Sequence, residues 1–198
     1  MKKAASHLPD REYERRSCAD IRFFSTYHAC PPLENLVFPI LSEVTLFNLS
    51  FMRTCFFIGR REPPDSLLPI LDAEVERHIT EHGVTDFVVG RYGRFDALAA
   101  KCVKEAKKRH PEATLLLLLP YHPYDRPTPT PTGFDGTRYP PGMETVPKRA
   151  AIIRANRYMV EHSGYLIAYV RHSGNAQDLV EYAKKYEKQD RIKITILP

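Results

Sequence analysis

The chain has 198 residues, of which 43% are hydrophobic and 27% are charged, and these values are typical of one globular domain with a full core. No apolar run is long enough to span a bilayer, which excludes a membrane-spanning helix. The net charge of +5 favours an anionic partner such as a nucleotide or a nucleic acid, although a mildly basic solvated surface explains it equally well.

The cysteines give no sign of a metal centre or of a disulfide framework. They are widely spaced and include no C-x-x-C pair. We therefore predict no metal site and no required cofactor, and we expect a protein of the reducing cytoplasm. The N-terminus also lacks the apolar stretch of a secretory signal. The four cysteines are Cys18, Cys30, Cys55 and Cys102.

Residues 1–51 differ from the rest of the chain because they show no clear hydrophobic period. Met52 stands directly before the first regular strand, and we interpret it as the native start, with the preceding residues as upstream sequence read in frame. The alternative is a genuine N-terminal extension, helical around Leu33 to Phe51, that packs on the domain. Both interpretations place the domain at residues 52–198.

Short apolar strands and amphipathic helices alternate from Met52 onward. We expect strands at Thr54–Ile58, Asp86–Val89, Leu115–Leu119, Tyr165–Val170 and Ile192–Leu197. We expect helices at Leu67–Ile79, Phe95–Arg109, Pro147–His162 and Ala176–Tyr186, the third with Ala150, Ile153 and Met159 facing inward. The segment from Tyr121 to Thr145 has no period and is predicted to be a long loop, which either covers a ligand site or packs down on the domain.

This alternation is typical of βαβ units, with helices on both faces of a parallel sheet. The sequence therefore predicts the α/β class, as a Rossmann-like three-layer α/β/α fold around a five-stranded, mainly parallel sheet. If the strands lie in the order 3-2-1-4-5, the order reverses between the first and the fourth. Ligands of such sheets bind there, beyond the carboxyl ends of the strands. Three loops would then share one rim, at Gly59–Glu62, Gly90–Asp96 and His172–Asn175.

The second of these loops carries the strongest signal, because a buried strand passes through a glycine-punctuated turn into a helix. Gly90 and Gly93 permit a sharp turn and the close approach of a ligand. Backbone N–H groups at such a helix start attract anions. Asp96 has two interpretations, as a cap that receives the N–H groups of the turn or as a ligand contact.

Arginines and a later helix start add to the predicted anion site. Arg60 and Arg61 directly follow the first strand, and arginine forks suit phosphate, although both would also serve as solvated loop charges. Gly174 precedes the last helix, whose N-terminus could bind phosphate. The predicted ligand-binding residues are Gly59, Arg60, Arg61, Gly90, Arg91, Tyr92, Gly93, Asp96, Arg154, Asn156, Arg157, His172, Ser173, Gly174 and Asn175.

The chain lacks the sequence patterns of several enzyme classes. It contains no Walker A lysine motif, no complete G-x-G-x-x-G, no G-x-S-x-G elbow and no paired-histidine metal motif. Acidic residues near the predicted rim are few, so no pair of carboxylates is an evident general acid and base. Catalytic residues therefore stay unassigned.

The rim segments resemble the SLOG superfamily, the Rossmann-like nucleotide-binding domain that DNA-processing proteins of bacterial transformation share with LOG (lonely guy) phosphoribohydrolases. Within it the chain is most similar to bacterial proteins related to YpsA, a branch of domains of unknown function. The resemblance covers about Met52 to Leu197 and implies nucleotide binding. It rests on the segments Phe56–Glu62, Phe87–Ala99, Ile153–Met159, Tyr165–Ala168 and Gly174–Ala183.

The chain departs from these relatives at two places. Arg60 stands where the superfamily usually has a histidine after the first glycine. The LOG enzymes carry a Gly-Gly-x-Gly-Thr-x-x-Glu signature before the last helix, and Leu179 stands here where the resemblance places the catalytic glutamate. This puts LOG-type release of a base in doubt, whereas backbone binding of phosphate needs no such residue.

The sequence thus predicts a module that binds a nucleotide or a nucleotide-derived ligand at the rim and acts as a sensor. One alternative is an enzyme resembling nucleoside-monophosphate phosphoribohydrolases, which would cleave an N-glycosidic bond with Glu62 or Asp96 as the substitute carboxylate. The other is a single-stranded DNA-binding module, whose affinity would depend steeply on salt. The expected partner is a small nucleotide-like ligand, with nucleic acid second, and the oligomeric state is left open.

Overall fold

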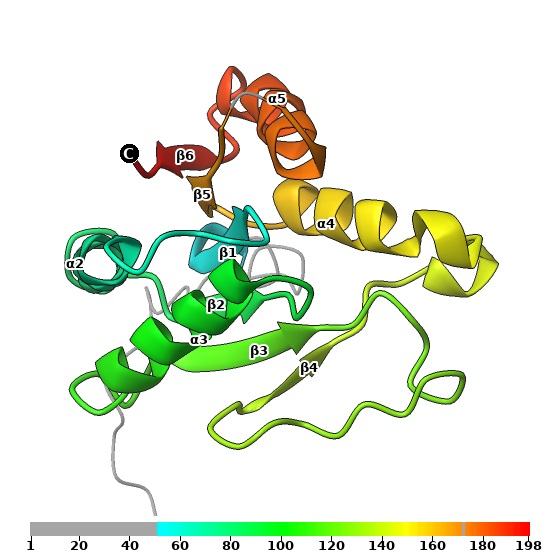
Figure 1. Cartoon of the computed structure of the whole chain (residues 1–198), viewed down its shortest axis with the longest axis horizontal. Coiled ribbons are helices and arrows are strands. Elements are labelled where there is room, and N and C mark those ends of the chain that lie inside the picture. Colours follow the sequence, from blue (N-terminus) through cyan, green and yellow to red (C-terminus); the bar gives the residue numbers. More distant parts are fainter. Residues whose placement is uncertain (1–50, 172) are drawn as a thin grey trace, which may run out of the picture. The chain divides into compact units, whose positions relative to one another are not determined.

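The computed structural model describes residues 51–171 and 173–198, so the interpretations of residues 1–50 and of His172 lie outside the described residues. Strands and helices alternate along the described chain (Figure 1). The strands are β1 (Thr54–Gly59), β2 (Asp86–Val89), β3 (Thr114–Leu118), β4 (Gly136–Arg138), β5 (Tyr165–Tyr169) and β6 (Lys193–Ile196). The helices are α2 (Leu67–Thr80), α3 (Arg94–Ala106), α4 (Ala151–Glu161) and α5 (Asn175–Glu187), with 3-10 turns η1 (Met143–Thr145) and η2 (Lys148–Ala150).

The described strands form one sheet in the order β4-β3-β2-β1-β5-β6, and every neighbouring pair is parallel. The predicted α/β class and Rossmann-like architecture are confirmed, and the five expected strands lie in the order anticipated for them. The strand number was wrong, because the segment expected to be a loop contributes β4. Gly136 pairs with Leu116 at the edge of the sheet, and three residues are too few to show a period.

Two hydrophobic cores lie on opposite faces of the sheet, because successive strand side chains point to opposite sides. In β1, Phe57 packs into the core with α2 and α3, and Phe56 packs into the core with α4 and α5. Neighbouring strands repeat the pattern, with Phe87 on the first side and Val88 on the second. Burial of both strand faces explains the near-continuous apolar runs in the sequence.

Helix α4 packs with a different phase from the predicted one. Its buried stripe is Ala151, Ala155 and Met159, at intervals of four residues, whereas Ile153 is 46% exposed. The stripe consists mainly of alanines. Alanine is less hydrophobic than isoleucine, so the sequence pattern assigned the buried face of the helix to Ile153 instead. The expectation that Ile153 faces inward was therefore wrong.

Strand order reverses at β1, since the chain leaves it toward β2 on one side and returns through β5 on the other. The loops after β1, β2 and β5 therefore meet beyond the carboxyl ends of the strands. This edge of the sheet, called the rim below, is where α3 and α5 begin.

Candidate functional site

A cleft of about 400 Å³ opens at the rim, between the ends of β1 and β2 and the start of α5. Its volume lies within the range of small-ligand sites and leaves room for about one nucleotide unit. The cleft is lined by Phe56, Phe57, Ile58, Gly59, Arg60, Arg61, Glu62, Gly90, Tyr92, Gly93, Asp96, Ile152, Asn156, Ser173, Gly174, Asn175 and Ala176. The structure thus brings all but four of the predicted ligand residues together, the exceptions being Arg91, Arg154, Arg157 and the undescribed His172.

Backbone hydrogen bonds fix the rim loops relative to one another. The Arg60 N–H donates to the Tyr169 carbonyl at 3.1 Å, which ties the first loop to β5. The Arg94 N–H donates to the Arg61 carbonyl at 2.9 Å, which ties it to the start of α3. A Cβ atom on Gly93 would lie 3.2 Å from the Arg61 Cα, so this approach favours glycine.

Gly59 has a packing role at the end of β1. A Cβ atom there would lie 2.3 Å from Cγ of Phe95, whose buried ring sits in the first turn of α3. The absence of a side chain therefore lets α3 begin directly against β1. The sequence singled out Gly59 as a ligand contact, and this close approach accounts for it without a ligand.

The start of α3 is closed by a carboxylate of its own chain. Asp96 stands three residues after the N-cap, Gly93, and accepts the Tyr92 N–H at 2.9 Å. Burial raises the pKa of Asp96, while backbone hydrogen bonds from Tyr92 and Gly93 oppose that rise. The capping interpretation of Asp96 accounts for these contacts, since the carboxylate binds N–H groups that an external anion would need.

The start of α5 has no such closure. Gly174 is its N-cap with a φ of 115°, and no side chain caps the helix there. A Cβ atom at Gly174 would meet nothing within 4 Å, so glycine is required here by the backbone conformation alone. Asn175 and Ala176, the first two residues of the helix, line the cleft. Their end of the helix dipole therefore faces space that an anion can enter.

Arg60 and Arg61 supply the positive charge of the cleft. Both are exposed, and neither makes an ion pair or a side-chain hydrogen bond with another described residue. Arg94, which also follows a rim glycine, is instead engaged by an ion pair with Asp65. Two guanidinium groups without acidic partners, beside an uncapped helix start, make a site suited to phosphate.

The other predicted arginines point elsewhere. On α4, Asn156 faces the cleft, but Arg154 pairs with Glu161 at 3.7 Å. The Arg157 guanidinium lies 5.0 Å from the centre of the Tyr182 ring, on the side of α4 that meets α5. Arg154 and Arg157 therefore add no charge to the cleft. The cause is the orientation of α4, which also leaves Ile153 exposed.

Arg91 faces a neighbouring cavity instead of the cleft. Its guanidinium donates to Oγ1 of Thr128 at 3.4 Å, across the long segment between β3 and β4. That segment had two interpretations, as a cover over the ligand or as a part packed on the domain. Within the predicted loop from Tyr121 to Thr145, Met143 is buried in the α4 side of the core, so this part packs on the domain. Tyr121 lines the cavity beside Arg91, and a covering role for the loop stays a prediction.

The cleft offers little for acid–base catalysis. Glu62 lines it without an ion-pair partner among the described residues, and the Asp96 carboxylate is bound by the α3 turn. Leu179, where the resemblance places the LOG glutamate, is buried in the core. The described residues contain no group of three metal-ligating side chains, and none of their helices is long and apolar enough to cross a membrane.

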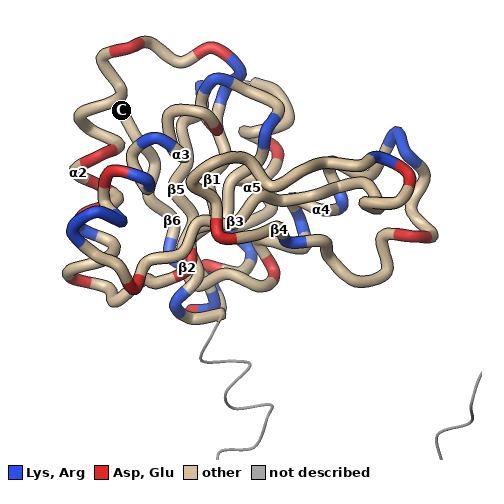
Figure 2. The backbone as a smooth tube through the Cα atoms, turned by 90° about the horizontal axis from the view of Figure 1, so that it is seen from below, with Lys and Arg blue, Asp and Glu red and all other residues tan. Residues whose placement is uncertain are grey.

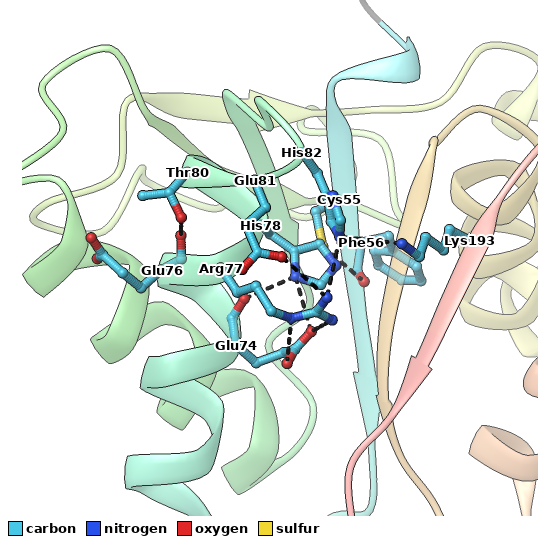
Figure 3. Close-up of polar contacts among 10 residues, drawn as sticks. All are labelled: Cys55, Phe56, Glu74, Glu76, Arg77, His78, Thr80, Glu81, His82 and Lys193. Carbon is cyan, nitrogen blue, oxygen red and sulfur yellow. Dashed lines mark hydrogen bonds and ion pairs between the residues drawn. The ribbon is translucent and has the colours of Figure 1, made fainter.

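A second polar cluster, which was not predicted from the sequence, lies between α2 and the first residue of β5 (Figure 3). Nδ1 of His78 is 2.8 Å from the Glu74 carbonyl, so Nδ1 carries the proton and donates. Nε2 is then an acceptor, buried without a hydrogen-bond partner among the described residues. Burial lowers the pKa of His78 and keeps the ring neutral.

The surroundings of His78 identify this cluster as structural. His82 stacks on Tyr165 at 5.2 Å, and Arg77 forms an ion pair with Glu74. These contacts join α2 to the start of β5 and leave Nε2 of His78 without a hydrogen-bond partner among the described residues. Spacing at i, i+4 from Glu74 through His78 to His82 was the sequence signal for it.

The fold resembles that of a protein with known DNA binding. No protein-family model and no curated protein matches the chain. A solved structure of DNA processing protein A from Helicobacter pylori, reported for its single-stranded DNA-binding mode, matches with a TM-score of 0.52. The sequences are 17% identical, and the match covers 76% of this chain and 67% of that one. This shows a shared fold and is compatible with the SLOG resemblance, while the YpsA-like branch stays a prediction.

Proposed function

We propose that the rim cleft binds the phosphates of single-stranded DNA. The observation that carries the proposal is the meeting of Arg60 and Arg61, which lack acidic partners among the described residues, with the uncapped start of α5. Guanidinium forks and free helix N–H groups both bind phosphate well. The sequence placed a small nucleotide first and DNA second, and the proposal reverses that order.

The fold match supports the reversal. The Helicobacter pylori protein binds single-stranded DNA, and its fold matches 76% of this chain. A shared fold does not fix a function. The match therefore favours DNA over other phosphate-bearing ligands but does not by itself identify DNA as the ligand. The cleft itself supplies the chemistry on which the proposal depends.

The distribution of charge is consistent with a local phosphate site. The first fifty residues carry six basic and six acidic side chains, so the net charge of +5 belongs to the rest of the chain. Figure 2 shows basic and acidic residues interspersed along the backbone of the domain. Attraction of DNA would therefore come from the unpaired rim arginines more than from a large basic face.

A free nucleotide is the second candidate. The cleft is concave and about 400 Å³ in volume, which suits one enclosed ligand unit better than an extended strand. In that case the protein would sense a nucleotide through the same arginines and the same helix start. N-glycosidic hydrolysis has less support, because Asp96 is engaged and no carboxylate stands at Leu179.

Fluorescence anisotropy of the full chain with a labelled oligothymidylate tests the first candidate. We expect binding that weakens between about 50 and 200 mM salt, because each phosphate contact contributes a slope of roughly 0.7 in the double-logarithmic plot. The double variant Arg60→Ala/Arg61→Ala should lose at least about tenfold in affinity and about one unit or more of that slope.

The matched control is Arg154→Ala/Arg157→Ala, which removes the same charge from residues outside the cleft. Its affinity should stay within about twofold of the wild type, since Arg154 is paired with Glu161, Arg157 lies over the Tyr182 ring, and neither side chain lines the cleft. Equal losses in both double variants would contradict the proposal, because attraction would then follow net charge. Binding of deoxynucleoside monophosphates but not of the oligomer would establish the second candidate instead.

A further inference from the structure

A second cavity adjoins the cleft along the rim, beyond the ends of β2 and β3. Its volume is about 440 Å³, comparable with that of the cleft. Tyr92 lines both spaces and forms the partition between them. The cavity is lined by Arg91, Tyr92, Leu119, Pro120, Tyr121, Arg126, Pro127 and Thr128.

The lining of this cavity is basic and aromatic. It contains the arginines Arg91 and Arg126 and no acidic residue. Arg91 is hydrogen-bonded only to the neutral Thr128 hydroxyl, and neither arginine forms an ion pair with a described carboxylate. Cations without counter-charges beside aromatic rings are the usual composition of sites for single-stranded nucleic acid.

The aromatic groups of the cavity lie beside its arginines. The Arg126 guanidinium lies over the Tyr121 ring, 4.9 Å from its centre, and its positive charge lies near the Tyr92 side chain. Burial and the nearby Tyr121 raise the pKa of Tyr92, which keeps its hydroxyl neutral and able to donate. The Tyr121 hydroxyl reaches the Lys148 carbonyl at 3.4 Å, which anchors the segment to the turn before α4.

We propose that this cavity is the subsite for the base of a second nucleotide, with the first held in the cleft. The ligand is then a strand of at least two nucleotides that passes over Tyr92. The base stacks on the planar pair of Arg126 and Tyr121, and Arg91 faces the linking phosphate. This inference rests on the proposed function and deepens it, because a free mononucleotide would leave the subsite empty.

The test compares the affinity of the full chain for the mononucleotide dTMP with that for the dinucleotide pdTpdT, both by competition with the labelled oligomer. Tyr121→Ala and Arg126→Ala should each weaken pdTpdT by about 5- to 150-fold, the range for loss of one stacked base. Their affinity for dTMP should stay within about twofold of the wild type. A dinucleotide with 2-aminopurine as its second base should change emission on binding, and Tyr121→Ala should abolish that change.

Two surface variants of the same region serve as controls. Tyr124→Ala removes a tyrosine that is 88% exposed and lines neither space, and Arg149→Ala removes an exposed charge just after Lys148. Both should leave the two affinities unchanged. Thermal melting of each variant confirms that it folds.

Several outcomes would overturn the subsite. The first is equal weakening of dTMP and pdTpdT binding by Tyr121→Ala, and the second is equal affinity of the wild type for the two ligands. The third is a selective loss of pdTpdT affinity in Lys104→Ala, because Lys104 lines a third cavity on the other side of α3. Failure of the proposed function is a separate result, because Arg60→Ala/Arg61→Ala would then leave both ligands bound as before.

Discussion

Helices α3 and α5 begin at the same rim, and both have a glycine N-cap, but only one start is open to a ligand. In α3 the residue three positions after Gly93 is Asp96, whose carboxylate binds the turn. In α5 the residue three positions after Gly174 is Gln177, whose amide instead donates to Glu181 at 3.0 Å. The α3 start is therefore closed from within, and the α5 start is available.

The comparison shows that a strand–glycine–helix pattern does not identify an anion site by itself. The pattern around Gly90 and Gly93 is the strongest in the sequence, yet its N–H groups are bound by the chain's own carboxylate. An acidic residue at the third helical position is a competitor for any external anion. The weaker pattern, which has glutamine there, leaves the site open.

The largest effect is expected from Gly59→Ala, which displaces Phe95 from the first turn of α3. The added Cβ would overlap the ring, and such overpacking costs about 3 kcal/mol of unfolding free energy. Urea denaturation measures the loss. Gly136→Ala is the matched strand control, because its Cβ would meet only Leu116, at an ordinary 3.6 Å. A cost for Gly59→Ala no larger than that of the control would show that α3 can shift away from β1.

Gly174→Ala should cost about 1–3 kcal/mol, since a φ of 115° is strained for any residue with a Cβ. It should also weaken oligothymidylate binding severalfold, because relief of the strain would rotate the first N–H groups of α5 away from the phosphate in the cleft. Gly83→Ala is the control, with a φ of 64° and nothing within 4 Å of its Cβ, at the far end of α2. It should lose stability without losing affinity. Unchanged affinity in Gly174→Ala would place the phosphate elsewhere.

The sequence predicted those parts of the fold that depend on hydrophobic periodicity. The five longer strands, the four helices and the gathering of three loops follow from buried runs such as Phe87–Val89 and from glycines at their ends. Strand β4 could not be found this way, since Gly136–Arg138 is short and only partly buried. Arg154 and Arg157 were misplaced because the phase of α4 is set by small alanines.

Asp96→Ala tests the closure of α3 directly. Loss of a capping carboxylate costs about 1 kcal/mol, which thermal or urea denaturation can measure. DNA affinity should stay level or rise slightly, because a negative group leaves the rim. This outcome would distinguish the two interpretations of Asp96 that the sequence left open. A tenfold loss of affinity in a folded Asp96→Ala protein would make the carboxylate a ligand contact.

The smallest change in stability, and the sharpest test of the comparison, is expected from Gln177→Asp. It places a carboxylate in α5 at the position that Asp96 occupies in α3, where helix-dipole and capping interactions contribute about 0.3–1 kcal/mol. The same carboxylate should bind the N–H groups of Ser173 and Gly174, as Asp96 binds those of Tyr92 and Gly93, and should lower oligothymidylate affinity severalfold. Gln177→Ala removes the hydrogen bond to Glu181 without adding charge, so its affinity should not change. If the two variants bind DNA equally well, the α5 start is not where phosphate lies, and Arg60 and Arg61 would have to bind it alone.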